Sequence, residues 1–182
     1  MIIHKEHLSD YYKNGLVSDN ENFVFLAYKL IKNGHIVDNI VSRLAAFQVA
    51  IPSWALGAGG TRFGRFSFYG EPSSLEQKIE DVGILHSLTQ SAGAVSLHIP
   101  WDIPSDYAAI KEQADDLNIK FDSVNSNTFQ DQKDASESYK YGSLSNTSKA
   151  VRDQAIQHNL DVINIGNKLG SKSLTVWLAD GS

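Results

Sequence analysis

The amino-acid sequence predicts an α/β protein built on a parallel sheet, in the form of the first half of a (β/α)8 TIM barrel. Four short segments rich in β-branched and aromatic residues alternate with amphipathic helical patterns. This alternation is typical of doubly wound sheets and of (β/α)8 barrels. A complete barrel needs about 250 residues, whereas this chain has 182. Four strands would also leave open sheet edges, so we expect an N-terminal fragment truncated after strand four.

A helical lead-in is expected before the sheet. Residues 1–46 contain helical patterns at 21–33 and 36–46, which meet at the dipeptide Asn33-Gly34. An Asn-Gly pair breaks a helix because both residues accept the left-handed conformation of a turn. We therefore predict two units, a lead-in over 1–46 and a half-barrel over 47–182.

The half-barrel segments follow in order along the chain. Strands are predicted over 47–56, 95–101, 120–127 and 173–180. The first helix follows Pro72, where Ser73 and Glu76 have the spacing of a capping box. Its apolar residues recur at spacings of three and four, and they are Leu75, Ile79, Val82, Leu85 and Leu88. The second helix is expected after Ser105, with the apolar positions Tyr107, Ile110, Ala114 and Leu117, and the third runs from Val151 to Leu169 and ends near Gly170.

Composition excludes several classes of partner. The chain has 16 Lys and Arg against 21 Asp and Glu, which gives a formal net charge of −5 and argues against nucleic acid or anionic membranes as partners. It has no cysteine, and its first residues lack the pattern of a signal peptide. No apolar run reaches the roughly 20 residues that span a bilayer. We therefore expect a soluble cytoplasmic protein with a small-molecule partner.

Aromatic residues gather where the predicted strands end. Trp54, Trp101 and Trp177 lie at or near the ends of strands one, two and four, and Phe129 follows strand three. The carboxyl ends of parallel strands meet at one rim, where indole faces can stack on the C–H faces of a sugar. The alternative is that these side chains only fill the barrel core.

His98 is the candidate for proton transfer. In the alternating strand VSLHIPW, Ser96, His98 and Pro100 share one face and Val95, Leu97 and Ile99 share the other. A neutral imidazole at the inner face can exchange protons with a hydroxyl near pH 7, which suits the opening of a cyclic sugar. Asp102 either orients this ring or takes the proton onward, or it only caps the following helix. His158 lies on a helical apolar stripe, so we predict a structural role for it.

Several segments in order resemble the N-terminal half of L-rhamnose isomerase, in its broad-specificity bacterial branch. They are AIPSWALGAGGTRFGRF, EPSSLEQKIED, VSLHIPWD, FDSVNSNTFQD, SYKYGSLS and GSKSLTVWLADGS. The resemblance covers the chain from about residue 45 to Ser182 and implies a metal-dependent aldose-ketose isomerase on a xylose isomerase-like (β/α)8 barrel. L-rhamnose, L-mannose and D-allose are the kinds of sugar that it implies.

The resemblance also implies roles for particular residues. His98 corresponds to the residue that assists sugar ring opening, and Trp54, Phe129 and Trp177 correspond to the aromatic substrate pocket. Phe63, in the loop GTRFGRF, would complete the pocket of a neighbouring subunit in a homotetramer. Of the strand-end carboxylates, Asp122 and Asp180 are available here, and we assign neither to a metal.

The cofactor that the resemblance implies is a divalent metal, usually Mn²⁺. In the family its Glu, Asp and His ligands lie on strands five to eight, outside these residues, so we expect the 182-residue chain by itself to be inactive. Two alternatives remain open. One is a sugar or sugar-phosphate epimerase of the same barrel superfamily, and the other is a non-catalytic, sugar-binding half-barrel.

Overall fold

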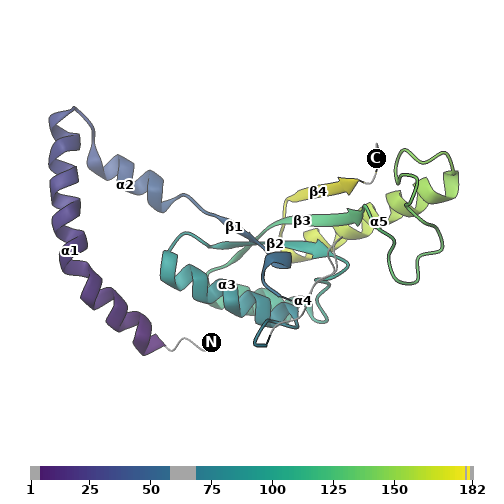
Figure 1. The fold of residues 1–182 in the computed structure, drawn as a ribbon, viewed down its shortest axis with the longest axis horizontal. Helices are drawn as coiled ribbons and strands as arrows, with labels where there is room; N and C mark the ends of the chain where they lie inside the picture. The colour runs from purple at the N-terminus through teal and green to yellow at the C-terminus, as the bar shows by residue number, and fades with distance from the viewer. Residues whose placement is uncertain (1–4, 58–68, 179, 181–182) are drawn as a thin grey trace.

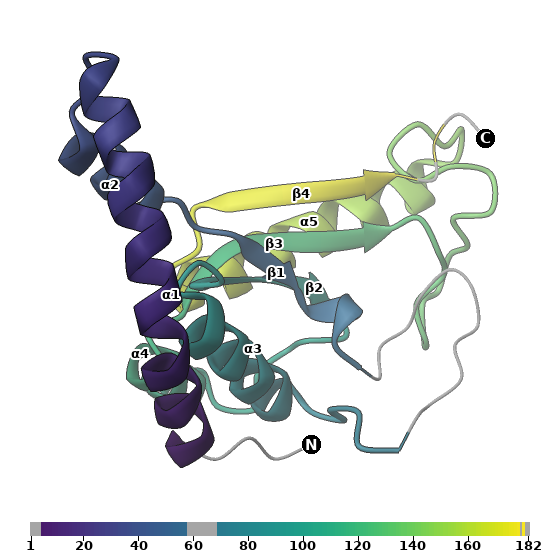
Figure 2. The same cartoon turned by 60° about the vertical axis from the view of Figure 1, so that its left-hand side comes forward.

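Four parallel strands form a single sheet in the order β1 (Ala50–Pro52), β2 (Ala94–Ile99), β3 (Lys120–Thr128) and β4 (Ser173–Leu178). The structure is a computed structural model that describes residues 5–57, 69–178 and 180. The strands alternate with helices and point the same way (Figure 1; Figure 2). The predicted α/β class is therefore confirmed, and the arrangement is consistent with half of a (β/α)8 barrel.

The first strand is shorter than predicted. Pairing with β2 covers Ala50, Ile51 and Pro52, and the chain then forms a 3-10 turn, η1, over Ser53–Ala55. Pro52 has no backbone N–H to donate to a sheet ladder, which favours its place at the end of a strand. Trp54 consequently lies in the turn and not in the strand.

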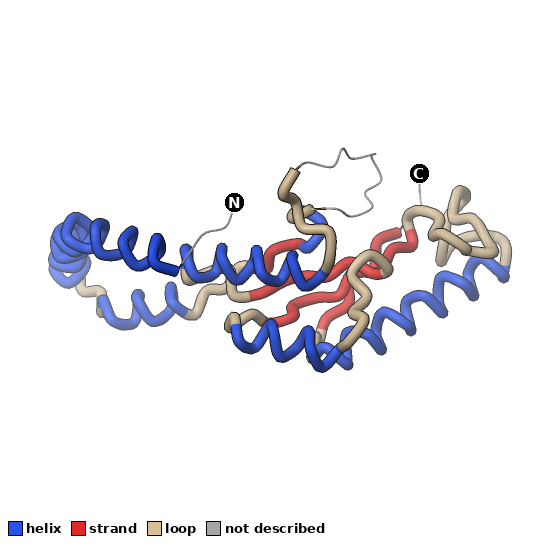
Figure 3. Tube along the Cα trace, turned by 90° about the horizontal axis from the view of Figure 1, so that it is seen from below, coloured by secondary structure: helices blue, strands red, loops and turns tan. Residues whose placement is uncertain are grey.

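The helices α3 (Leu75–Thr89), α4 (Tyr107–Asp116) and α5 (Lys149–Leu169) pack against one face of the sheet (Figure 3). Burial of their apolar stripes against the sheet is the main source of stability for this face. The buried core consists of Leu75, Ile79, Val82, Val95, Leu97, Ile99, Ile110, Ala114, Ile119, Val124, Val162 and Leu169.

The start of α3 differs from the predicted capping box by one residue. Ser74, and not Ser73, is the N-cap, and its hydroxyl accepts a hydrogen bond from the Gln77 N–H at 3.3 Å. The Gln77 side chain reaches back and accepts from the Ser73 N–H at 2.7 Å. Ser74 and Gln77 therefore form a variant of the box, in which the return bond goes to the residue before the N-cap. Ser-Ser offers two registers, and a glutamine serves as well as a glutamate. The predicted end of α5 at Gly170 is confirmed by its left-handed φ of 83°.

The lead-in consists of α1 (Lys5–Lys32) and α2 (Val37–Ala45), which project from the sheet as an arm (Figure 1). The predicted break at Asn33-Gly34 is confirmed, because Gly34 has a φ of 82°. Helix α1 begins at Lys5, far earlier than the predicted start at residue 21. The prediction missed the first half of the helix because that half is too polar to show an apolar period. The Tyr12 hydroxyl contacts α3 by donating to the carbonyls of Ser87 and Leu88.

Candidate functional site

His98 projects from β2 on the side of the sheet opposite the helices. Its neighbours Leu97 and Ile99 are 0% and 2% exposed in the helix-facing core, which confirms the alternation that the sequence predicted. The histidine itself is 3% exposed. Neither of its ring nitrogens has a hydrogen-bond partner among the described residues. Buried polar atoms normally have partners, so the two unpaired nitrogens mark this imidazole as a candidate for contact with a ligand.

Four aromatic rings surround the His98 imidazole. Trp101 stacks on it with ring centroids 4.3 Å apart, and Trp54 approaches edge-on at 5.2 Å. Phe129 and Trp177 complete the group at 5.9 and 6.2 Å. The structure thus brings together four of the predicted site residues, His98, Trp54, Phe129 and Trp177, from four separate segments. Phe63 lies outside the described residues.

Strand pairing sets the position of Trp177. Asn125 of β3 pairs with His98 of β2. Trp177 of β4 pairs with Asn127, which lies two residues after Asn125 on β3. The Trp177 indole N–H donates to the Asn125 side-chain oxygen at 3.0 Å, and the Asn125 amide donates to the Leu97 carbonyl at 2.8 Å. Because both ends of the amide are engaged, Asn125 holds the indole beside the imidazole, at a tilt of 43°. The indole remains 43% exposed, so one wall of the site faces solvent.

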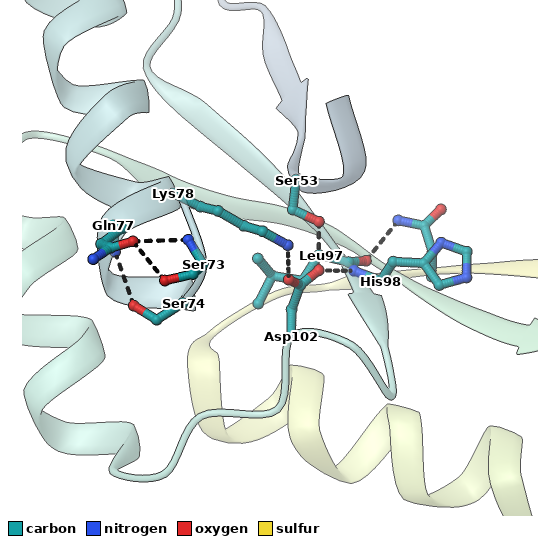
Figure 4. Close-up of polar contacts among 9 residues, drawn as sticks. Ser53, Ser73, Ser74, Gln77, Lys78, Leu97, His98 and Asp102 are labelled. Atoms are coloured by element: carbon teal, nitrogen blue, oxygen red, sulfur yellow. Dashed lines mark hydrogen bonds and ion pairs between the residues drawn. The ribbon is translucent and has the colours of Figure 1, made fainter. Parts of the chain in front are cut away.

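Of the roles expected for Asp102, the cap of the following helix is wrong. The helix that follows begins at the N-cap Asp106, so Asp102 does not cap it. Its carboxylate accepts from the backbone N–H of His98 at 2.8 Å, while the imidazole points away from it (Figure 4). The aspartate therefore fixes the backbone of His98 and makes no hydrogen bond to its ring.

Two partners of Asp102 were missed by the sequence analysis. The Lys78 ammonium of α3 lies 2.7 Å from one carboxylate oxygen, and the Ser53 hydroxyl donates to the other (Figure 4). A signal for Lys78 exists in the sequence, because its spacing from Leu75 and Val82 places it on the buried stripe of α3. A lysine there is buried only with a partner.

Burial makes His98 a neutral group at pH 7. Burial lowers the pKa of its imidazole to about 4, against the opposing effect of the Asp102 carboxylate, while His158 and Lys78 lower it further. The unprotonated ring has one nitrogen that accepts a proton and one that donates. At pH 7 the neutral ring can therefore accept a hydrogen bond on one nitrogen and donate one from the other.

The lowered pKa of His98 predicts an acid-sensitive stability. The pKa of His98 has its ordinary value of 6.5 in the unfolded chain and a value of about 4 in the folded chain. Between these pH values the unfolded state therefore binds more protons than the folded state. The free energy of unfolding should fall as pH drops from 6.5 to 4, by at most about 3 kcal/mol and less where solvent screens the ring.

Urea titrations at several pH values would measure this slope in the wild type and in His98→Asn. The slope should be reduced in the variant, since asparagine does not titrate. An unchanged slope in the variant would contradict the assignment to His98.

His158 has the structural contact that its predicted role requires. Its Nε2 accepts a hydrogen bond from the Asn127 backbone N–H at 3.0 Å and thereby ties α5 to the end of β3. Burial lowers its pKa, against the opposing effect of Asp161. The neutral form is the one that can accept this bond.

The described residues do not fit a divalent metal. They contain no group of three or more His, Asp or Glu side chains close enough to hold an ion. Asp122 is the third residue of β3, near its amino end, so its description as a strand-end carboxylate is wrong. Asp180 is engaged by loop residues, since Ser143 and Ser145 donate to its carboxylate. Burial acts to raise the Asp180 pKa, but these hydrogen bonds outweigh it and lower the pKa.

Two curated proteins are similar to the chain over most of its length. A protein named probable sugar isomerase from Rhizobium meliloti (strain 1021) is 48% identical over 170 residues, which is 93% of this chain and 39% of that protein. Another with the same description, from Mesorhizobium japonicum, is 48% identical over 161 residues, which is 88% of this chain and 37% of that protein. The chain thus spans about two fifths of the length of these relatives. No protein-family profile matches it.

The length and apolar character of the helices bear on whether the chain could cross a membrane. Within residues 5–57, 69–178 and 180, no helix combines the length and the apolar character needed to cross a bilayer.

Proposed function

We propose that this chain is part of a sugar isomerase that interconverts aldoses and ketoses, with L-rhamnose and related aldoses as substrates. The similarity to two proteins named probable sugar isomerase supports the reaction class. The preference for L-rhamnose comes from the resemblance of the sequence segments and is the narrower part of the proposal.

One observation carries the proposal at the level of the site. A buried imidazole, whose two nitrogens have no hydrogen-bond partner among the described residues, lies among the rings of Trp54, Trp101, Phe129 and Trp177. Aromatic faces bind the C–H faces of sugars, and the imidazole supplies the polar group that a hydroxyl needs. Buried polar atoms usually have partners, so the two unpaired nitrogens favour a ligand contact over a purely structural role.

The chemistry proposed for His98 is the opening of the sugar ring. One ring nitrogen accepts the proton of the anomeric hydroxyl while the bond between the anomeric carbon and the ring oxygen breaks. The electron pair of that bond passes to the ring oxygen, which takes up a proton from the imidazole. No net charge or atom is gained, and the product is the open-chain aldose.

The later transfer between the first two carbons is not assigned to the residues described here. The resemblance implies that Mn²⁺ supplies this step, yet the described side chains do not fit such an ion. We propose that the metal ligands are provided by sequence outside the 182 residues. Of the alternatives, an epimerase would exchange a proton at C3 and would not convert aldose to ketose.

The test compares two preparations with Mn²⁺ and L-rhamnose. One is the complete gene product that contains this chain, and the other is residues 1–182 alone. We expect ketose to form with the first and not with the second. If the complete product binds the sugar but forms no ketose, the proposal of an isomerase fails and the sugar-binding alternative is favoured. Ketose formed by residues 1–182 would contradict the assignment of the metal ligands to other sequence.

A further inference from the structure

The ion pair of Lys78 and Asp102 is buried where a helix meets the end of a strand. The two side chains are 4% and 1% exposed, and the ammonium lies 2.7 Å from the carboxylate. Desolvation of two charges often offsets their attraction, so a buried pair is weak support for stability by itself. The contacts of the pair indicate a more specific role.

Asp102 joins two walls of the candidate site. One of its oxygens accepts from the His98 backbone N–H at 2.8 Å, and the same oxygen accepts from the Ser53 hydroxyl. Ser53 is buried and immediately precedes Trp54, whose indole lies edge-on to the His98 ring. The angle between Trp54 and His98 therefore depends on where this carboxylate lies.

Lys78 holds the carboxylate in that place. The other Asp102 oxygen points to the lysine of α3 (Figure 4). Without the lysine, that oxygen loses its electrostatic attraction to the ammonium. The buried Asp102 carboxylate is then stabilised when its side chain turns toward water. Such a turn withdraws the acceptor from His98 and Ser53 together.

We propose that Lys78 is a positioning residue for sugar ring opening, which sets the imidazole of His98 against Trp54 through Asp102 and Ser53. The inference rests on the proposed function, because it assigns the ring-opening step to His98. Lys78 lies on the far side of the aspartate from the imidazole and acts through two backbone segments.

The kinetic test uses a substrate that needs no ring opening. Glyceraldehyde is too short to close a stable ring, whereas L-rhamnose is a cyclic hemiacetal. In the complete gene product, Lys78→Met should lower kcat/KM for L-rhamnose by about 10- to 100-fold, the usual cost of a misplaced group. The value for glyceraldehyde should change by no more than about twofold. Equal losses on both substrates, or no loss on either, would overturn the proposal.

A spectroscopic readout does not depend on turnover. Because the His98 ring stacks on Trp101, its ring protons should be shifted by the indole ring current in spectra of ¹³C-histidine-labelled protein. The shift should change in Lys78→Met, and His98→Asn identifies the signal. An unchanged shift would overturn the proposal. If the wild type forms no ketose, the proposed function fails, and this shift still shows whether Lys78 positions the imidazole of His98.

Two further variants keep the test decisive. Ser53→Ala removes one contact of Asp102 and leaves the ion pair intact, so it serves if Lys78→Met does not fold. It should lower kcat/KM for L-rhamnose by about 3- to 10-fold and shift the same signal. Lys149→Met is the matched control, because it breaks a pair with Asp153 in which the two side chains are 77% and 55% exposed. It should leave both readouts unchanged.

Discussion

His98→Asn is expected to lower kcat/KM for L-rhamnose by about 10²- to 10⁴-fold, the usual contribution of a positioned acid-base group. Asparagine nearly fills the space of the imidazole but cannot accept and return a proton. The surrounding rings of Trp54, Trp101, Phe129 and Trp177 stay in place, so the sugar should still bind. Steady-state kinetics on the complete gene product should therefore show a change in kcat with little change in KM.

Glyceraldehyde again provides the internal control for this variant. Since it needs no ring opening, its kcat/KM should change by less than about threefold in His98→Asn. A parallel loss on both substrates would show that the histidine acts in the later carbon-to-carbon transfer, or that the site has collapsed. Either result would remove His98 from the ring-opening step.

Leu97→Ala should reduce the free energy of unfolding by about 2–5 kcal/mol, the range measured for deletion of a buried leucine side chain. Leu97 is 0% exposed and lies in the core between the sheet and its helices. The substitution removes methyl groups that pack against them and leaves a cavity. Urea unfolding of the variant and the wild type at pH 7.5 measures the difference.

The control for this experiment is Ile103→Ala. Ile103 is 50% exposed, so its loss should change the free energy of unfolding by no more than about 0.5 kcal/mol. A similar loss at both positions would contradict the assignment of Leu97 to the core between the sheet and its helices. Leu97→Ala and His98→Asn together separate an effect on stability from an effect on catalysis at two adjacent residues of β2.

Much of the fold follows from periodic patterns in the sequence. The strands β2, β3 and β4 lie within about two residues of their predicted ends, because each is a short β-branched segment bounded by turn residues. Helix α5 ends at Gly170 as expected, since glycine readily adopts the left-handed conformation there. The inward direction of His98 follows from alternation in β2.

Other features depend on distance in space and have no local signal. The hydrogen bond between Asp102 and Lys78 joins residues 24 positions apart in the sequence. It exists only because α3 packs against β2 at one particular position along the strand. The sequence analysis considered the ring of His98 as the partner of Asp102 and overlooked its backbone. Likewise, the turn that carries Trp54 replaces the end of a predicted strand, because strand propensity does not reveal the residue at which strand pairing stops.

The segment from His98 to Asp102 closes on itself. The Asp102 N–H donates to the His98 carbonyl at 3.0 Å, and the Asp102 side chain accepts from the His98 N–H at 2.8 Å. The imidazole and the Trp101 indole that stacks on it therefore belong to one short cassette, which a protein designer could transplant to the end of another parallel strand. The transplanted segment would bring its own stacked imidazole and indole rings. Its host would have to supply a buried cation and a hydroxyl in place of Lys78 and Ser53.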